Sequence, residues 1–208
     1  MDEKSSYSSY PVILEDKYKA ECEELEESHF EKTIESQLNG KPILSPFLPT
    51  KSRDIESFIS FTGLSESDTV VDIGCGDGRV LVAAAKLTGC RGVGVDIAEE
   101  CLSLATKMAS QEGVSSQLDF VCLDATDPDC WSQLQPLLDR ATVLYLYVYP
   151  TLLKRLEEAV KYAQAKHIKV ITQTYHFESL NKSKIDEPSK LVLYDLSIPN
   201  SNDCETKS

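Results

Sequence analysis

Three alternating glycines flanked by carboxylates form the part of the chain with the clearest capacity for chemistry. The segment reads Val70-Val-Asp72-Ile-Gly74-Cys75-Gly76-Asp77-Gly78-Arg79. Glycines at alternate positions let a backbone turn tightly and approach a ligand without Cβ clashes. A dinucleotide loop would need the spacing G-x-G-x-x-G, but Arg79 occupies the place of its third glycine. Because Asp72 and Asp77 would repel a pyrophosphate, the loop favours a cationic ligand without phosphate.

Two further carboxylates stand where ligand-binding groups are expected. Asp96 follows the apolar run 92–95, and Asp124 follows the apolar run 120–123. Ligands of open α/β sheets bind outside the carboxyl ends of the strands, which brings both residues towards the glycine loop. A carboxylate such as Asp96 can accept hydrogen bonds from both hydroxyls of a ribose. The alternatives are local: Asp72 and Asp124 as turn residues, and Asp96 as a helix cap.

A framework of alternating strands and helices is needed to bring these residues together. Strands are predicted at 69–73, 91–95, 118–123, 142–148 and 168–174, and helices at 51–61, 80–87, 98–111, 129–138 and 151–166. This alternation predicts βαβ units with right-handed crossovers. A strand over 190–198, paired with a short one near 182–186, completes the fold. We therefore predict an α/β domain with a Rossmann-like, doubly wound, mostly parallel seven-stranded sheet and helices on both faces.

Charge and proline content divide the chain unevenly. The formal net charge is −13, and residues 1–40 hold eleven of the acidic residues against four lysines. Apolar residues recur every three to five positions over 12–38, which predicts an amphipathic helix, or two, packed on the domain or presented to a partner. Three prolines argue against a regular element in 41–50. We expect an acidic helical extension at 1–40, the α/β domain at 41–198, which holds the candidate site, and a disordered tail at 199–208.

Composition argues against several classes of function. The acidic balance opposes nucleic-acid binding. No apolar run approaches the ~18 residues of a membrane span, and the acidic N-terminus resembles neither a signal nor a transit peptide. Seven cysteines without a CxxC pair indicate free thiols in a reducing compartment, so we expect a cytoplasmic protein, with the nucleus as the alternative. The three histidines form no ligand-spaced cluster with the cysteines, so no metal is expected.

The glycine loop, with Asp96 and Asp124 in register, resembles the first motifs of class I (seven-strand) methyltransferases. The resemblance spans roughly residues 46–198 and implies S-adenosylmethionine as the cofactor. It also implies that Asp72 orients the methionine end, Asp96 the ribose, and Asp124 the adenine amino group. Cys75 is expected to fill space, since direct methyl transfer needs no covalent intermediate. The cofactor-binding residues expected from the resemblance are Asp72, Gly74, Cys75, Gly76, Asp77, Gly78, Asp96, Ile97, Asp124 and Ala125.

The segment after the fourth strand bears on the methyl acceptor. Enzymes that methylate adenine or glutamine amides carry a [D/N]-P-P-[Y/F] box there, whereas this chain has Tyr147-Val-Tyr149-Pro150. Residues 45–50, 72–80 and 144–150 resemble small protein-lysine methyltransferases of the ATP synthase c-subunit lysine methyltransferase type. That resemblance implies methylation of a protein amine, foremost a lysine. The acidic residues 1–40 depart from the membrane-associated N-terminal segment of the mitochondrial members.

Aromatic residues near the ends of the fourth and fifth strands fit an amine acceptor. Tyr145, Tyr147 and Tyr149 alternate along the chain, so a strand would project all three from one face. Those near the strand end could surround a methylammonium or a sulfonium through cation–π contacts. Tyr149 and Tyr147 are therefore candidate catalytic residues, the alternative being that they pack a helix onto the sheet. His176, after the fifth strand, is a candidate acceptor for the amine proton.

Three functions are compatible with these residues. The first is a monomeric methyltransferase acting on a protein amine, with a basic substrate favoured by the acidic extension. The second is methylation of a small metabolite, and the third is a non-catalytic cofactor-binding partner subunit. In each case Phe47 and Thr50, which precede the first helix of the domain, are expected to help cover the cofactor.

Overall fold

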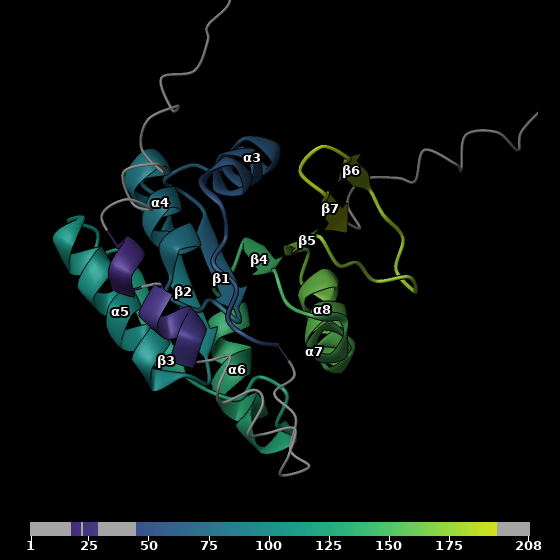
Figure 1. Ribbon diagram of the computed structural model, residues 1–208. Coiled ribbons are helices and arrows are strands. Elements are labelled where there is room, and N and C mark those ends of the chain that lie inside the picture. The colour runs from purple at the N-terminus through teal and green to yellow at the C-terminus, as the bar shows by residue number, and fades with distance from the viewer. Residues whose placement is uncertain (1–17, 22, 29–44, 195–208) are drawn as a thin grey trace, which may run out of the picture.

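The computed structural model describes residues 18–21, 23–28 and 45–194 (Figure 1). The predicted tail at 199–208, the last residues of the predicted strand 190–198 and most of the acidic extension lie outside the described residues. Within the extension, residues 19–21 and 23–28 are helical. Residues 45–50 contain no regular element, as their prolines predict.

Seven strands form one mixed sheet, which confirms the predicted fold class. They are β1 (Thr69–Ile73), β2 (Arg91–Asp96), β3 (Leu118–Cys122), β4 (Val143–Leu146), β5 (Lys169–Gln173), β6 (Lys184–Asp186) and β7 (Leu191–Tyr194). Their spatial order is β3-β2-β1-β4-β5-β7-β6. The first five pair in parallel, and β7 pairs antiparallel with both β5 and β6. The chain order reverses between β1 and β4, which is where such sheets bind ligands.

One face of the sheet is covered by α3 (Ser52–Thr62), α4 (Arg79–Thr88) and α5 (Glu99–Gln111) (Figure 1). Their apolar residues share a core with Val70, Tyr145 and Ile171, which point from the strands to this side. Successive strand residues point to opposite faces, so the neighbours of these three residues enter the other core. The sheet therefore carries a separate apolar layer on each side.

The opposite face is covered by α6 (Trp131–Leu138), α7 (Pro150–Arg155) and α8 (Glu157–Ala165), with a short 3₁₀ turn at Pro128–Cys130 before α6. Leu134 and Leu138 of α6 enter this second core beside Val160 of α8. The Trp131 ring meets the Tyr162 ring edge-on, with centroids 5.3 Å apart and an angle of 87° between the planes. None of the helices in the described part of the chain is long and apolar enough to cross a membrane.

The predicted helix over 151–166 is wrong in one respect, because the chain forms two helices. Leu156, which separates them, is fully buried and has φ −86° and ψ 2°. Its N–H is shared between the carbonyl oxygens of Leu152 and Leu153, each 3.1 Å away. Such three-centre bonds are common at helix ends. The helix is therefore interrupted at Leu156, whose side chain stays in the core.

The predicted strand over 142–148 is also too long, since β4 ends at Leu146. Tyr149 is the N-cap of α7 and Pro150 is its first residue. Proline favours that helical position and holds the preceding residue in an extended conformation. Tyr149 therefore belongs to the start of a helix, and the predicted strand alternation of tyrosines does not reach it.

The described part of the acidic extension packs along α5. The hydroxyl of Tyr18 donates to Gln111 Oε1 at 2.7 Å, and Leu25 packs against the core that contains α5. Lys107 Nζ lies 2.9 Å from Glu21 Oε1. Because Tyr18 is only 2 % exposed, its ring contributes to this contact by burial as well as by hydrogen bonding.

Candidate active site

A cavity of about 560 Å³ opens at the carboxyl edge of the sheet. This volume lies within the range of roughly 300–1,000 Å³ that is usual for small-molecule sites. Its walls come from the loop between β1 and α4, the ends of β2 and β4, the segment after β3, and residues 45–50, which we call the strap. Gly78 is the predicted cofactor residue that does not line it. Those that do are Asp72, Gly74, Cys75, Gly76, Asp77, Asp96, Ile97, Asp124 and Ala125.

The turn after β1 depends on its glycines. Gly74, Gly76 and Gly78 have φ values of 82°, 53° and 72°, which are unfavourable for residues with a Cβ. Gly76 lies beneath the strap, and a Cβ there would come within 2.8 Å of the Phe47 ring. Gly78 faces away from the cavity, where a Cβ would come within 2.7 Å of the Ala105 Cβ. Gly78 thus allows helices to pack closely, while Gly76 allows the strap to close over the loop.

Asp72 places a buried carboxyl group at the floor of the cavity. It is 2 % exposed, and no hydrogen bond among the described residues reaches its carboxylate. Burial, followed by the negative charges of Asp96 and Asp77, raises its pKa well above the ordinary value. An ionised carboxylate in such a place is costly unless a cation pairs with it. The site therefore suits a ligand with a positively charged end.

Asp96 binds two main-chain N–H groups at the end of β2. Its Oδ2 accepts from the Gly76 N–H at 2.8 Å, and its Oδ1 accepts from the Ala98 N–H at 3.0 Å. The second bond closes a turn before α5 and is not the helix cap that the sequence left open, because the N-cap of α5 is Ala98. The first bond fixes the glycine loop. A carboxylate oxygen can accept more than one hydrogen bond, so the ribose role stays a prediction that this geometry permits.

Asp124 lies in a turn two residues beyond β3. Its Oδ1 accepts from the Thr126 N–H at 2.8 Å and from the Thr126 hydroxyl at 2.7 Å. This is the turn role named as the alternative, and Asp124 also lines the cavity, where a second carboxylate oxygen is available as an acceptor. Ile97, 64 % exposed, and Ala125 line the same cavity. Apolar walls beside a carboxylate fit a flat base with an amino group, which keeps the predicted adenine site open to test.

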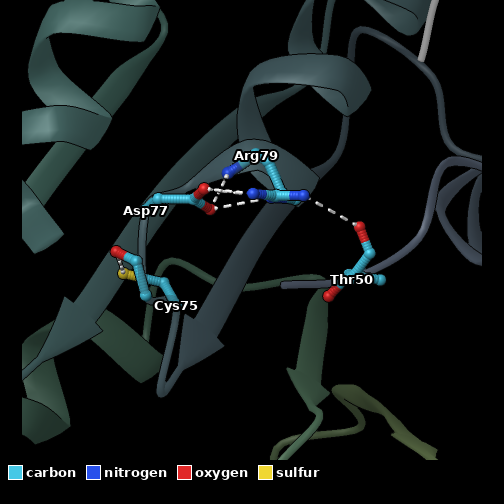
Figure 2. A network of polar contacts seen from close by, with 5 residues as sticks. Thr50, Cys75, Asp77 and Arg79 are labelled. Atoms are coloured by element: carbon cyan, nitrogen blue, oxygen red, sulfur yellow. Dashed lines mark hydrogen bonds and ion pairs between the residues drawn. The ribbon is translucent and has the colours of Figure 1, made fainter. Parts of the chain in front are cut away.

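A buried ion pair that sequence reasoning missed secures the loop (Figure 2). Arg79 Nη2 lies 2.7 Å from Asp77 Oδ2, and Arg79 Nε donates to both Asp77 oxygens at 3.0 and 3.1 Å. Arg79 Nη1 donates to the Thr50 carbonyl oxygen at 3.4 Å. The negative charge of Asp77 is thus balanced within the protein, unlike that of Asp72. The tripeptide Asp77-Gly78-Arg79 was a visible signal, but its partner Thr50 is 29 positions away.

Cys75 is a buried thiol inside the loop. Burial, and then the nearby charge of Asp72, raises its pKa well above the ordinary value. A nucleophilic cysteine needs the opposite shift. Its Sγ lies only 2.7 Å from where a Cβ on Gly94 would stand. These contacts support the space-filling role expected from the sequence.

Two tyrosines from the fourth strand and its end line the cavity. Tyr145 is 1 % exposed, and its hydroxyl donates to Gln173 Oε1. Tyr147 is half-buried, and the side chain of Thr174 lies beside its hydroxyl. Burial is the main cause that raises the pKa of Tyr147. Tyr147 therefore presents a neutral phenol to the cavity at physiological pH.

The structure does not bring the other two predicted catalytic residues to the cavity wall. The Tyr149 ring packs against the Tyr175 ring with centroids 5.3 Å apart, and its N–H donates to Ser45 Oγ at 3.2 Å. His176 Nδ1 lies 2.9 Å from Thr172 Oγ1. Burial, followed by the charge of Lys182, lowers the pKa of His176. Neither residue lines the cavity as Tyr147 does.

The sheet order with antiparallel β7, and a cavity edged by acidic side chains beyond β1, β2 and β3, define a class I methyltransferase. Residues 72–184 match the profile of the ANTKMT methyltransferase domain. The chain belongs to this family, and it is an S-adenosylmethionine-dependent methyltransferase.

Known proteins resemble the chain at different levels. A protein-lysine N-methyltransferase of Saccharolobus islandicus is 23 % identical over 141 residues, which cover 67 % of this chain and 83 % of that protein. A ribosomal protein L11 methyltransferase of Pectobacterium carotovorum is 37 % identical over 55 residues, covering 26 % of this chain but only 19 % of the relative. Among solved structures, an RNA methyltransferase of Salinibacter ruber in complex with S-adenosyl-L-homocysteine shares the fold. Its TM-score is 0.61 at 24 % identity, covering 71 % of this chain and 91 % of that one.

The residues present fit S-adenosylmethionine. Asp72 offers a buried negative charge to a cationic end, and the loop glycines leave room for close approach. Asp96 and Asp124 supply acceptors along the same cavity, and Ile97 an apolar surface. No cation other than Arg79, which is held by Asp77, lines the cavity within the described residues. That donor set disfavours a phosphate and suits a sulfonium cofactor.

Proposed function

We propose that this chain transfers a methyl group to the side-chain amine of a lysine in a protein. The observation that carries the proposal is one cavity with two kinds of wall. Asp72 and Asp96 line it, and so do Tyr145 and Tyr147, with Asp72 and Tyr145 paired on the neighbouring strands β1 and β4. Family membership and the protein-lysine N-methyltransferase of Saccharolobus islandicus support lysine as the acceptor.

Direct methyl transfer requires no covalent bond between the protein and either reactant. Bound S-adenosylmethionine supplies an activated methyl group. The chain's own residues must hold the donor, align the acceptor and exclude water. Asp72 would neutralise the cationic end of the cofactor, and Asp96 would accept from its ribose. The neutral hydroxyl of Tyr147 would accept a hydrogen bond from the amine and orient its lone pair.

The acceptor must lose a proton before it can attack. A free lysine has a pKa of about 10.4, so only a small fraction is neutral near pH 7. The lowered pKa of His176 keeps its imidazole neutral, and so able to accept a proton, near pH 7. His176 nevertheless lies away from the cavity wall. We therefore propose that the amine is deprotonated by solvent as it leaves water for the aromatic rim. Turnover should then rise with pH between 7 and 9.

We propose a basic protein as the partner. Glu23, Glu24, Glu26 and Glu27 are all exposed on the helical part of the extension. Such a surface would speed encounter with a basic substrate, an effect that added salt should weaken. A cytoplasmic location, expected from the cysteine content, and a monomeric state complete the proposal. Cell fractionation and light scattering would test these two points.

A transfer assay tests the proposal directly. The protein is incubated with radiolabelled S-adenosylmethionine and, in parallel, with a protein extract, a metabolite extract or total RNA. The expected result is a labelled protein band whose label survives as methyl-lysine after acid hydrolysis. The Asp96→Asn variant should lose the band, while Asp119→Asn, at an exposed carboxylate of β3, should keep it. Label confined to metabolites or to RNA would overturn the lysine proposal, and cofactor binding without transfer would indicate a partner subunit.

A further inference from the structure

Thr50 connects the strap to the start of α4 and lies beside β4. Its carbonyl oxygen accepts from Arg79 Nη1 at 3.4 Å, and its side chain lies beside the Tyr145 hydroxyl. Tyr145 in turn donates to Gln173 on β5. The exposed fractions of these side chains are small: 6 % for Thr50, 7 % for Arg79, and 1 % each for Tyr145 and Gln173. Buried polar side chains thus lie one beside the next from the glycine loop past the strap to β5.

The Arg79 guanidinium donates hydrogen bonds to two segments, the glycine loop and the strap. Its Nε and Nη2 are occupied by Asp77, while Nη1 points to the strap (Figure 2). A planar guanidinium offers these donors at once in a fixed geometry. A lysine ammonium could keep the ion pair with Asp77 but has no second arm for Thr50. The contact to Thr50 can therefore be removed without removing the buried charge pair.

The strap contacts both the glycine loop, where the cofactor is expected, and the tyrosines, where the acceptor is expected. Each residue from Ser45 to Thr50 lines the cavity. Phe47 covers the glycine loop at Gly76. Ser45 Oγ accepts from the Tyr149 N–H, where the aromatic rim begins. A displacement of the strap would therefore open the cofactor end and shift the rim together.

We propose that Arg79 and Thr50 are positioning residues that hold the strap over the cofactor. Arg79 fixes the strap to the glycine loop through the Thr50 carbonyl, and the Thr50 side chain lies beside Tyr145. The inference rests on the proposed function only for its turnover readout, because cofactor affinity and strap order are measured without an acceptor. Neither residue touches the reacting atoms in this assignment. Their effect passes through Phe47 and the rest of the strap.

Three variants and one control separate this role from simple stability. Arg79→Lys keeps the charge opposite Asp77 and loses the arm to Thr50. Thr50→Val keeps the shape of the side chain and loses the hydroxyl, while Thr50→Ser restores the hydroxyl. Arg91→Lys, at an exposed arginine of β2 outside the cavity, is the matched control. Arg79→Lys should weaken S-adenosylhomocysteine binding about tenfold, which is the factor expected for one lost charge-assisted hydrogen bond.

The KM for S-adenosylmethionine should rise in Arg79→Lys by the same factor, and more than kcat falls. Thr50→Val should weaken binding in the same direction by a smaller factor, and Thr50→Ser should recover part of the loss. Arg91→Lys should bind as the wild type does. Calorimetry with S-adenosylhomocysteine, below the melting temperature of each variant, gives the affinities. Variants that melt earlier but bind with wild-type affinity would overturn the positioning role.

Limited trypsin digestion reads the strap directly. Lys51 is exposed and immediately follows the strap, so cleavage after it reports how often the strap leaves the domain. Arg79→Lys and Thr50→Val should be cut there several-fold faster than the wild type without any ligand. Equal cleavage rates would overturn the proposal. If the wild type transfers no methyl group to any extract, cleavage and binding still decide this point, so the two proposals can fail separately.

Discussion

The two halves of the carboxyl edge are built by different means. Beyond β1, β2 and β3, carboxylates such as Asp96 and Asp124 are fixed by main-chain N–H groups in short turns. Beyond β4 and β5, aromatic rings are fixed by other side chains, as Tyr149 is by Tyr175. The first half is encoded by a compact motif and suits a constant ligand. The second is assembled from distant segments, so its shape can change with the acceptor while the cofactor half stays the same.

The largest expected effect is a loss of stability when the buried ion pair of the cofactor half is broken. Asp77→Ala leaves the Arg79 guanidinium buried without its carboxylate. Removing one partner of such a pair typically costs about 3–5 kcal/mol. The free energy of unfolding, measured by urea denaturation at pH 7, should fall by this amount. Asp119→Ala, at an exposed carboxylate, is the control. A loss below about 1 kcal/mol would mean that the pair is solvated and does not organise the loop.

The next effect concerns cofactor affinity. Asp96→Ala removes the acceptor for the Gly76 N–H and the predicted acceptor for a ribose. A hydrogen bond to a charged group contributes about 1.5–3 kcal/mol, so S-adenosylhomocysteine should bind roughly 10- to 150-fold more weakly. Calorimetry measures the change. If affinity falls less than threefold, Asp96 acts only as an acceptor for main-chain N–H groups, which would weaken the contrast between the two halves.

A pH-dependent effect of intermediate size is expected at Asp72. Burial raises its folded-state pKa well above the ordinary value. The stability linked to this group is therefore complete at low pH and is lost as the pH rises through the folded-state pKa. Asp72→Asn removes that loss, so the ligand-free variant should melt higher than the wild type at pH 8. A gain of about 1 kcal/mol would raise the Tm by roughly 2–4 °C.

The Asp72→Asn advantage should shrink as the pH is lowered towards 4.5, because the wild-type carboxyl then takes up its proton. Scanning calorimetry across this range tests the sign. The same variant should bind S-adenosylhomocysteine more weakly, since the cationic end loses its partner. A variant that melts lower than the wild type at pH 8 would show that Asp72 is already paired in the ligand-free protein.

The smallest expected effect lies in the acceptor half. Tyr147→Phe removes a hydroxyl that faces the cavity and should lower kcat about 3- to 10-fold, the range expected for one neutral hydrogen bond. Affinity for S-adenosylhomocysteine should not change. Tyr149→Phe should have a smaller effect on kcat, because that residue is outside the cavity wall. Steady-state kinetics that reverse this order would move the acceptor path towards Tyr149 and Tyr175.

The sequence predicted best what is local. The apolar runs of the central strands, the glycine turn and the acidic residue at the end of β2 all arise from neighbouring residues, and each lies where the pattern indicates. Gly78 shows the limit even there. Its spacing suggested a ligand contact, but its neighbour is Ala105 on α5, because the loop glycines also serve the packing of helices.

What the sequence could not predict depends on distant contacts or on small conformational choices. Tyr149 was predicted to share a strand face with Tyr145 and Tyr147, but β4 ends at Leu146 and Pro150 starts a helix, so Tyr149 is the N-cap of that helix. Arg79 gave no sign of its partner Thr50, since the sequence carries no distance information between a loop and a strap. The break at Leu156 lies inside a sequence pattern that favours one helix. Leu156 is buried in the second core, and its neighbours in sequence do not mark it as a helix end.

Trp131 gives the molecule a useful optical property. It is the single tryptophan of the chain, and its ring packs on Tyr162 in the layer of α6 and α8, away from the cavity wall. Its emission should follow the unfolding of that helical layer and stay almost constant while the cavity fills. In this protein, intrinsic fluorescence therefore reports the integrity of the scaffold, and occupancy of the site must be followed by heat or by a labelled ligand.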